Sequence, residues 1–179
     1  MCNRLFLKYI FTLCITLGTI AIAQANQNGI PGYSTSETGS SSCHACHTPP
    51  SSAPTNTLTI TGNQTVLTGS INSYTINLIA PYTQDVSHGG YNLSASNGIL
   101  SAVDTESQIF NNELVHSNRK ATTDTGSSYN VSWTFNWQAP AVASTSTFYA
   151  CGLPVNGDGQ AIVTGGHGGG GGGGKWGQS

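Results

Sequence analysis

Alternating polar and apolar positions in the middle of the chain predict β-strands. The clearest stretch is 129–137, where every second residue is large and apolar: Tyr129, Val131, Trp133, Phe135 and Trp137. Shorter stretches of the same kind lie at 58–60, 73–79, 91–95, 99–103, 147–151 and 161–163. Turn residues such as Ser96-Asn97-Gly98 separate them, and no stretch keeps a helical period. The pattern predicts an all-β antiparallel β-sandwich over 58–164, with the alternating aromatic residues in its core.

The two ends of the chain differ from this middle region. Arg4 and Lys8 precede an apolar run at 10–22, and small residues at 21–25 suit cleavage, so 1–25 is expected to be a signal peptide. An uncleaved membrane anchor is the alternative, but the apolar run is shorter than the ~20 residues that span a bilayer. We expect no transmembrane segment in the mature chain. The Gly-rich tail, 165–179, is expected to be disordered.

The charge balance excludes one class of partner. The 179 residues include 5 Lys and Arg against 7 Asp and Glu. Removal of Arg4 and Lys8 leaves three cations and seven acids, a net charge of −4 with neutral histidines. Because a nucleic-acid-binding protein needs basic clusters, no nucleic-acid partner is expected.

The segment 26–57 is rich in Ser, Thr, Gly and Pro and carries the most specific motif, Cys43-His44-Ala45-Cys46-His47. A CxxCH sequence is the attachment site of a c-type haem. Cys43 and Cys46 would each bond a vinyl group of the porphyrin, and His47 would bind the iron as the proximal ligand. The sequence therefore predicts one covalently attached haem c in an N-terminal loop ahead of the sandwich.

Three other sites could contain such a pair of cysteines. A structural zinc site needs about four ligands, and the chain has no second Cys pair. A thioredoxin-like redox pair would accompany a βαβ pattern, which is absent. A plain disulfide is the third alternative. Cys151 is the remaining cysteine of the mature chain, expected to be either a buried inert thiol or the site of an intermolecular bond.

The sixth iron ligand is restricted by composition. The only methionine is Met1, in the predicted signal peptide, so a methionine ligand from the mature chain is excluded. Four histidines remain as candidates: His44, His88, His116 and His167. His44 is too close to the attachment site to reach the far side of the porphyrin, and His167 lies in the tail.

Several blocks resemble a family of exported bacterial domains that carry one CxxCH ahead of a Reelin-like β-sandwich, often called the choice-of-anchor V domain. The similar blocks are 29–34 (GIPGYS), the CxxCH, 114–117 (LVHS), 135–140 (FNWQAP), 148–152 (FYACG) and 156–159 (NGDG). The resemblance implies an immunoglobulin-like or Reelin-like sandwich and places His116 at the family's histidine, which makes it the candidate distal ligand. The chain departs from the family at Thr48-Pro49-Pro50, at Cys151 and in its Gly-rich end.

Together these features predict an exported monohaem c-type cytochrome domain that transfers electrons in the periplasm, at the cell surface or outside the cell. Its partner would be a redox protein. No Ser-His-Asp or paired-carboxylate arrangement supports catalysis, so an electron-transfer protein is favoured over an enzyme. Two alternatives stay open: a haem-based sensor or weak peroxidase, and a surface structural or adhesive β-sandwich protein.

Overall fold

The regular elements of the described chain are all strands. The computed structural model describes residues 28–32, 34, 56–81, 86–155 and 174–175. The strands are β1 (Thr57–Thr61), β2 (Ile71–Pro81), β3 (His88–Ala95), β4 (Ile99–Ala102), β5 (Ser107–Phe110), β6 (Glu113–His116), β7 (Lys120–Ala121), β8 (Thr123–Asp124), β9 (Ser128–Gln138), β10 (Thr147–Val155) and β11 (Gly174–Lys175). Within these residues no helix is present, and hence none that could cross a membrane.

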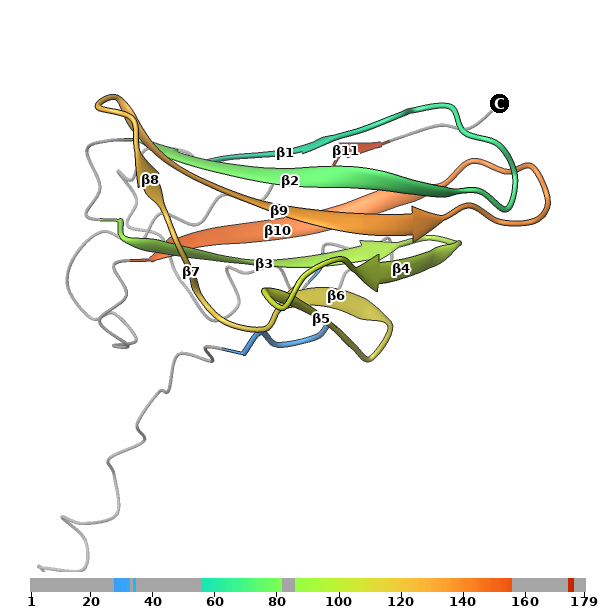
Figure 1. Ribbon diagram of the computed structural model, residues 1–179, viewed down its shortest axis with the longest axis horizontal. Helices are drawn as coiled ribbons and strands as arrows, with labels where there is room; N and C mark the ends of the chain where they lie inside the picture. Colours follow the sequence, from blue (N-terminus) through green and yellow to red (C-terminus); the bar gives the residue numbers. More distant parts are fainter. Residues whose placement is uncertain (1–27, 33, 35–55, 82–85, 156–173, 176–179) are drawn as a thin grey trace, which may run out of the picture.

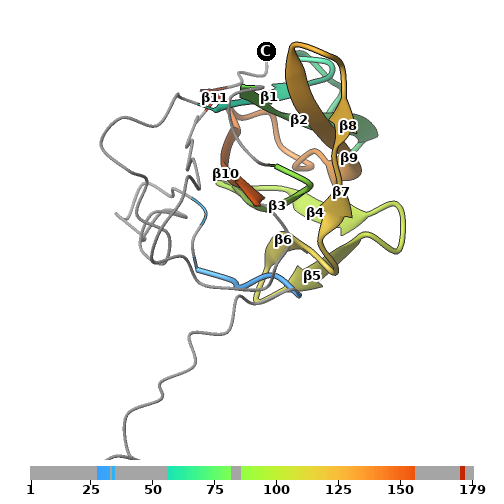
Figure 2. The same cartoon turned by 90° about the vertical axis from the view of Figure 1, so that its left-hand side faces the viewer.

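The strands form two antiparallel sheets that pack face to face (Figures 1 and 2). Sheet I has the order β1-β2-β9-β4, with β8 also paired to β9. Sheet II has the order β11-β10-β3-β6-β5, with β7 also paired to β3. The predicted antiparallel β-sandwich is confirmed.

The alternation of side chains along the long strands builds the core between the sheets. β2 and β9 pair over their whole length, from Ile71 opposite Gln138 to Pro81 opposite Ser128. Because successive side chains of a strand point to opposite faces, this register sends one apolar row of each strand inward. The inward aromatic residues Trp133, Phe135 and Trp137 are all buried, as the sequence predicted.

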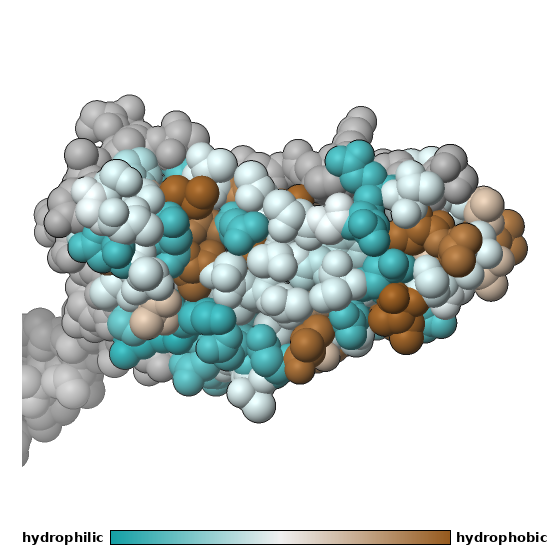
Figure 3. Space-filling model, turned by 45° about the horizontal axis from the view of Figure 1, so that its top comes forward, coloured by the Kyte–Doolittle hydropathy of each residue, from teal (hydrophilic) through white to brown (hydrophobic). Residues whose placement is uncertain are grey.

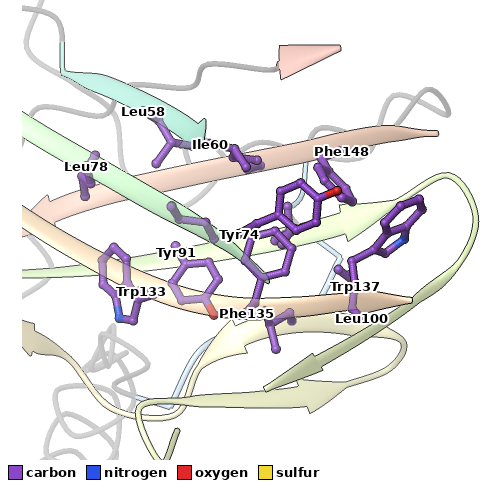
Figure 4. Packing of buried hydrophobic residues seen from close by; sticks show 14 of the residues in the cluster. Leu58, Ile60, Tyr74, Leu78, Tyr91, Leu100, Trp133, Phe135, Trp137 and Phe148 are labelled. Carbon is purple, nitrogen blue, oxygen red and sulfur yellow. The ribbon is translucent and has the colours of Figure 1, made fainter. Parts of the chain in front are cut away.

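Aromatic side chains pack against one another in this core (Figure 4). The Tyr74 ring stacks on Phe135 at a centroid distance of 5.5 Å and meets Phe148 edge-on at 5.2 Å. Phe148 also meets Trp137 at a right angle, with centroids 5.4 Å apart. These edge-to-face pairs join β2 and β9 of sheet I to β10 of sheet II.

The hairpin of β5 and β6 was not predicted from the sequence. Its strands are four residues each, and Asn111 and Asn112 connect them with φ values of 50° and 65°. Two consecutive positive φ angles are typical of a tight two-residue hairpin turn, which asparagine tolerates. The hairpin places His116 at the end of β6, beside β3.

Two other expectations concern the C-terminal part. The predicted strand at 161–163 lies outside the described residues. In the Gly-rich tail, β11 pairs with the start of β10, with Lys175 opposite Thr147. The rest of the tail, His167 included, is also outside the described residues.

Candidate functional site

The haem-attachment motif lies outside the described residues, so Cys43, His44, Cys46 and His47 have no described positions. The described residues that flank the motif on either side nevertheless have defined positions. Ser34 precedes Cys43 by nine positions, and Asn56 follows His47 by nine positions. Ser34 and Asn56 are both buried, so the segment starts and ends at fixed places on the sandwich.

A short N-terminal segment lies along the outer face of sheet II (blue in Figures 1 and 2). It consists of residues 28–32 and 34 and is called the anchoring segment. The Gln108 side-chain amide donates to the Asn28 carbonyl at 2.7 Å. The Asn92 side-chain amide donates to the Ile30 carbonyl, also at 2.7 Å. A polar side chain from β5 and another from β3 therefore hold the backbone of this segment on the sheet.

Glu113 completes the attachment with its carboxylate. The Gly32 amide donates to Oε2 at 2.6 Å, and the Ser34 hydroxyl donates to Oε1 at 2.6 Å. The Ser34 hydroxyl also lies 2.8 Å from that of Ser94 on β3. Hydrogen bonds to a carboxylate are stronger than those between neutral groups, so this is the firmest point of the anchoring segment.

His116, the candidate distal ligand, lies beside this segment and is partly buried. Its Nδ1 is 3.1 Å from the amide nitrogen of Tyr91 and 3.0 Å from the Tyr91 carbonyl oxygen. The imidazole fills the space above Gly90, where a Cβ atom would lie 2.7 Å from Cε1. Gly29, at a φ of 71°, approaches the His116 carbonyl so closely that a Cβ would lie 2.6 Å from it.

The contact with Tyr91 has a consequence for metal chemistry. When Nδ1 carries the proton, it donates to the Tyr91 carbonyl, and Nε2 is then the nitrogen with a lone pair for a metal. A histidine that binds a metal commonly donates its other N–H to a carbonyl, which fixes the ring and makes it a better ligand. In the other tautomer Nδ1 accepts from the Tyr91 amide at 3.1 Å and Nε2 carries the proton. The surroundings of His116 therefore fit the role of an iron ligand through Nε2 in the first tautomer.

Tyr91 is itself held firmly. Its ring packs on Trp133 at a centroid distance of 4.7 Å, and its hydroxyl donates to the Ser107 hydroxyl at 2.8 Å. Burial raises the pKa of the Tyr91 hydroxyl well above its ordinary value, an effect that the hydrogen bond to Ser107 partly offsets. Tyr91 remains neutral and gives His116 a rigid backbone partner.

His88 is the other candidate histidine in the described chain. It lies on β3 two residues before Gly90, on the same face of sheet II. Its Nδ1 is 2.8 Å from the Ser87 hydroxyl. Partial desolvation and then the charge of Arg119 lower the pKa of His88, which favours the neutral ring. No carbonyl contact comparable to that of His116 orients its imidazole among the described residues.

The structure corrects the expectation for the state of Cys151. It was expected to be an inert thiol or the site of an intermolecular bond, but in the structure it is fully buried and forms a disulfide. It lies opposite Asn92, and since Ala150 joins the core cluster, the side chain of Cys151 belongs to the outer face of sheet II. Its partner lies outside the described residues, and the chain's other cysteines are Cys2, Cys14, Cys43 and Cys46.

No group of three or more His, Cys, Asp or Glu side chains arranged to hold a metal occurs in the part of the chain that the structure describes. No family model matches the chain, and no curated protein or solved structure matches it significantly. The resemblance to the Reelin-like cytochrome family therefore rests on the sequence blocks alone.

Proposed function

We propose that this protein is an exported monohaem c-type cytochrome domain that transfers electrons to or from another redox protein. The observation that carries the proposal is the sequence Cys43-His44-Ala45-Cys46-His47. When bound, a haem iron supplies one-electron chemistry by changing between its ferrous and ferric states. The proposal includes export by the signal peptide 1–25 and a location in the periplasm, at the cell surface or outside the cell.

The residues take distinct roles in this proposal. Cys43 and Cys46 hold the porphyrin by thioether bonds, and His47 is the proximal ligand. His116 is the distal ligand through Nε2, with Nδ1 directed to the Tyr91 carbonyl at 3.0 Å. Two imidazole ligands favour a lower potential than an imidazole and a methionine would.

The anchoring segment supports this assignment of His116. It passes Gly29 next to the His116 carbonyl and binds Ser34 through Glu113, and Cys43 follows nine positions later. Nine residues span up to about 30 Å, so chain length allows His47 and His116 to approach one iron from opposite sides. The outer face of sheet II is the surface where this would take place.

The disulfide of Cys151 favours a second candidate function. If the signal peptide with Cys2 and Cys14 is removed, only Cys43 and Cys46 remain as partners. A cysteine in a disulfide has no thiol for a thioether bond, so this disulfide and double attachment of haem exclude each other. A disulfide-stabilised surface β-sandwich with a structural or adhesive role is therefore the alternative.

One experiment separates the two candidates. The full chain is expressed in a bacterium that attaches c-type haem, and the exported protein is examined by pyridine haemochrome spectrum and intact mass under denaturing conditions. The cytochrome proposal expects one haem per chain that survives denaturation, and loss of it in Cys43→Ala with Cys46→Ala. Exported wild-type protein without haem, whose mass shows one disulfide, would establish the structural alternative.

The ligand assignment has its own test. The matched variants are His116→Ala and His88→Ala, because the His116 ring lies against Gly90 of β3 and His88 lies on β3 two residues before that glycine. Only His116→Ala should convert a six-coordinate low-spin spectrum to one that binds carbon monoxide at once after reduction. Prompt carbon monoxide binding by the wild type would instead indicate an open site and overturn the bis-histidine assignment.

A further inference from the structure

The strand β1 is an edge strand of sheet I without the usual protection against pairing. It bonds only to β2 among the described residues, and its five residues are in continuous register, Thr57 opposite Ile79 through Thr61 opposite Thr75. Its sequence, TLTIT, contains no charge, proline or glycine. Natural edge strands usually carry lysine, proline or a bulge, since an open edge offers unpaired N–H and C=O groups to another strand.

The edge of sheet II on the same side of the sandwich is better protected against pairing with another strand. There β11 covers the start of β10, where Thr147 and Phe148 are paired. β10 also contains Pro154, which has no N–H to offer. β1 is thus the less protected of these two edges.

The sequence of β1 is self-complementary about Thr59. If two copies pair antiparallel with Thr59 opposite Thr59, then Thr57 lies opposite Thr61, and Leu58 lies opposite Ile60. Thr57, Thr59 and Thr61 are exposed, whereas Leu58 and Ile60 face the core. Hydroxyls would meet hydroxyls on the outer face, and apolar side chains would meet on the inner one. Such pairs stabilise antiparallel strands, and a two-fold axis requires a surface that matches itself.

Charge is nearly absent from the strands of sheet I: their one charged residue is Asp124, on the short strand β8, which pairs with β9 and not with β1. β1, β2, β9 and β4 contain no Asp, Glu, Lys or Arg. Instead, rows of small polar side chains cross the strands, such as Thr61, Thr75 and Thr134, which are aligned in register. Figure 3 shows such pale residues across the middle of this view, with brown and teal groups to either side. Two copies joined at β1 therefore bring no like charges together along the joined strands.

We propose that two copies of this chain associate through β1, related by a two-fold axis at Thr59, so that sheet I continues from one copy into the other. The paired edge is five residues long, and a small interface gives a weak complex. The association is independent of haem and of the proposed electron transfer.

The test is sedimentation of the full exported chain over about 10 μM to 1 mM, a range that covers weak dimers. The wild type should rise from the monomer mass towards twice that mass. Thr59→Lys places two like charges opposite each other at the axis and should remain monomeric. Thr75→Lys is the matched control, since Thr75 lies on the same face but in the inner strand β2 and should dimerise as the wild type does.

Sedimentation of a mixture of Thr59→Lys and Thr59→Glu is the decisive measurement. Opposite charges at the axis should restore association that each variant lacks alone, which a loss of folding could not produce. A wild type that stays monomeric over the whole range overturns the proposal. Equal effects of Thr59→Lys and Thr75→Lys, or no association in the mixture, overturn it as well.

Discussion

The imidazole of His116 is bonded to the backbone of Tyr91 at the point where the ladder between β3 and β6 stops. The register of these strands covers Asn92 with Val115 and Leu93 with Leu114. At the next position the Nδ1 of His116 takes the place of a backbone partner, 3.1 Å from the amide nitrogen of Tyr91 and 3.0 Å from its carbonyl. The side chain is therefore part of the sheet's hydrogen bonding as well as the candidate ligand.

This double role gives the first prediction. In the haem-free protein, His116→Ala leaves the backbone groups of Tyr91 without this partner and should lower the free energy of unfolding by about 1–2 kcal/mol. Urea unfolding measures the change. His88→Ala is the control and should cost less, because its imidazole bonds the side chain of the neighbouring Ser87 and not the backbone of another strand. A larger cost for His88→Ala would contradict the structural role of His116.

The second prediction concerns Cys151→Ser. Because the disulfide would occupy one of the two motif cysteines, its removal should increase the fraction of exported chain that carries haem bonded to both Cys43 and Cys46. Intact mass and peptide mass mapping measure that fraction. In haem-free protein the same variant should lose about 2–4 kcal/mol of stability, the usual contribution of a disulfide. Leu153→Ala, also on the outer face of β10, controls for packing and should leave haem attachment unchanged.

The third prediction concerns the attachment of the anchoring segment. Glu113→Gln replaces a carboxylate that accepts from Gly32 and Ser34 at 2.6 Å each, and should weaken the contact by about 1–2 kcal/mol. Hydrogen exchange at the Gly32 amide should become faster by roughly ten-fold, since 1.4 kcal/mol is a factor of ten in an equilibrium. Glu106→Gln, which removes the partly exposed ion pair with Lys120, should leave that amide unchanged.

The fourth prediction concerns pH. Burial raises the pKa of the Tyr74 hydroxyl above its ordinary value, and this hydroxyl donates to the Asn63 carbonyl at 2.9 Å. Since the folded pKa exceeds the unfolded one, the stability that this group contributes is present below about pH 10 and is lost as pH rises further. Tyr74→Phe should be less stable near neutral pH by about 1 kcal/mol but should lose less on going to alkaline pH. Chemical unfolding at both pH values tests this, and equal alkaline losses would refute it.

The long strands were predictable because their two-residue period is strong. β9 alternates over its whole length, and the burial of Trp133, Phe135 and Trp137 follows from that period. The hairpin β5–β6 was not predicted because four-residue strands give too few repeats to show a period. The pair Asn111-Asn112 was the available signal, since asparagine is one of the residues that tolerates positive φ.

For the candidate site, the sequence predicts a haem-attachment motif but not the contacts that fix the neighbouring segment on the sandwich. The motif at 43–47 predicts the haem ligands from the sequence alone, and it stays a prediction because those residues lie outside the described part of the chain. The sequence could not reveal that Glu113, Asn92 and Gln108 hold the anchoring segment, since each contact joins positions more than 60 apart. The disulfide of Cys151 could not be predicted for the same reason, because the chain's other cysteines are also far from it in the sequence.

The uncharged outer face of sheet I also determines how the protein responds to its solvent. The strands β1, β2, β9 and β4 have no acidic or basic side chain that salt could screen, so contacts made through them should be insensitive to ionic strength. The two outer faces of the sandwich thus differ in chemistry: that of sheet I offers uncharged side chains, whereas that of sheet II holds the anchoring segment through the Glu113 carboxylate.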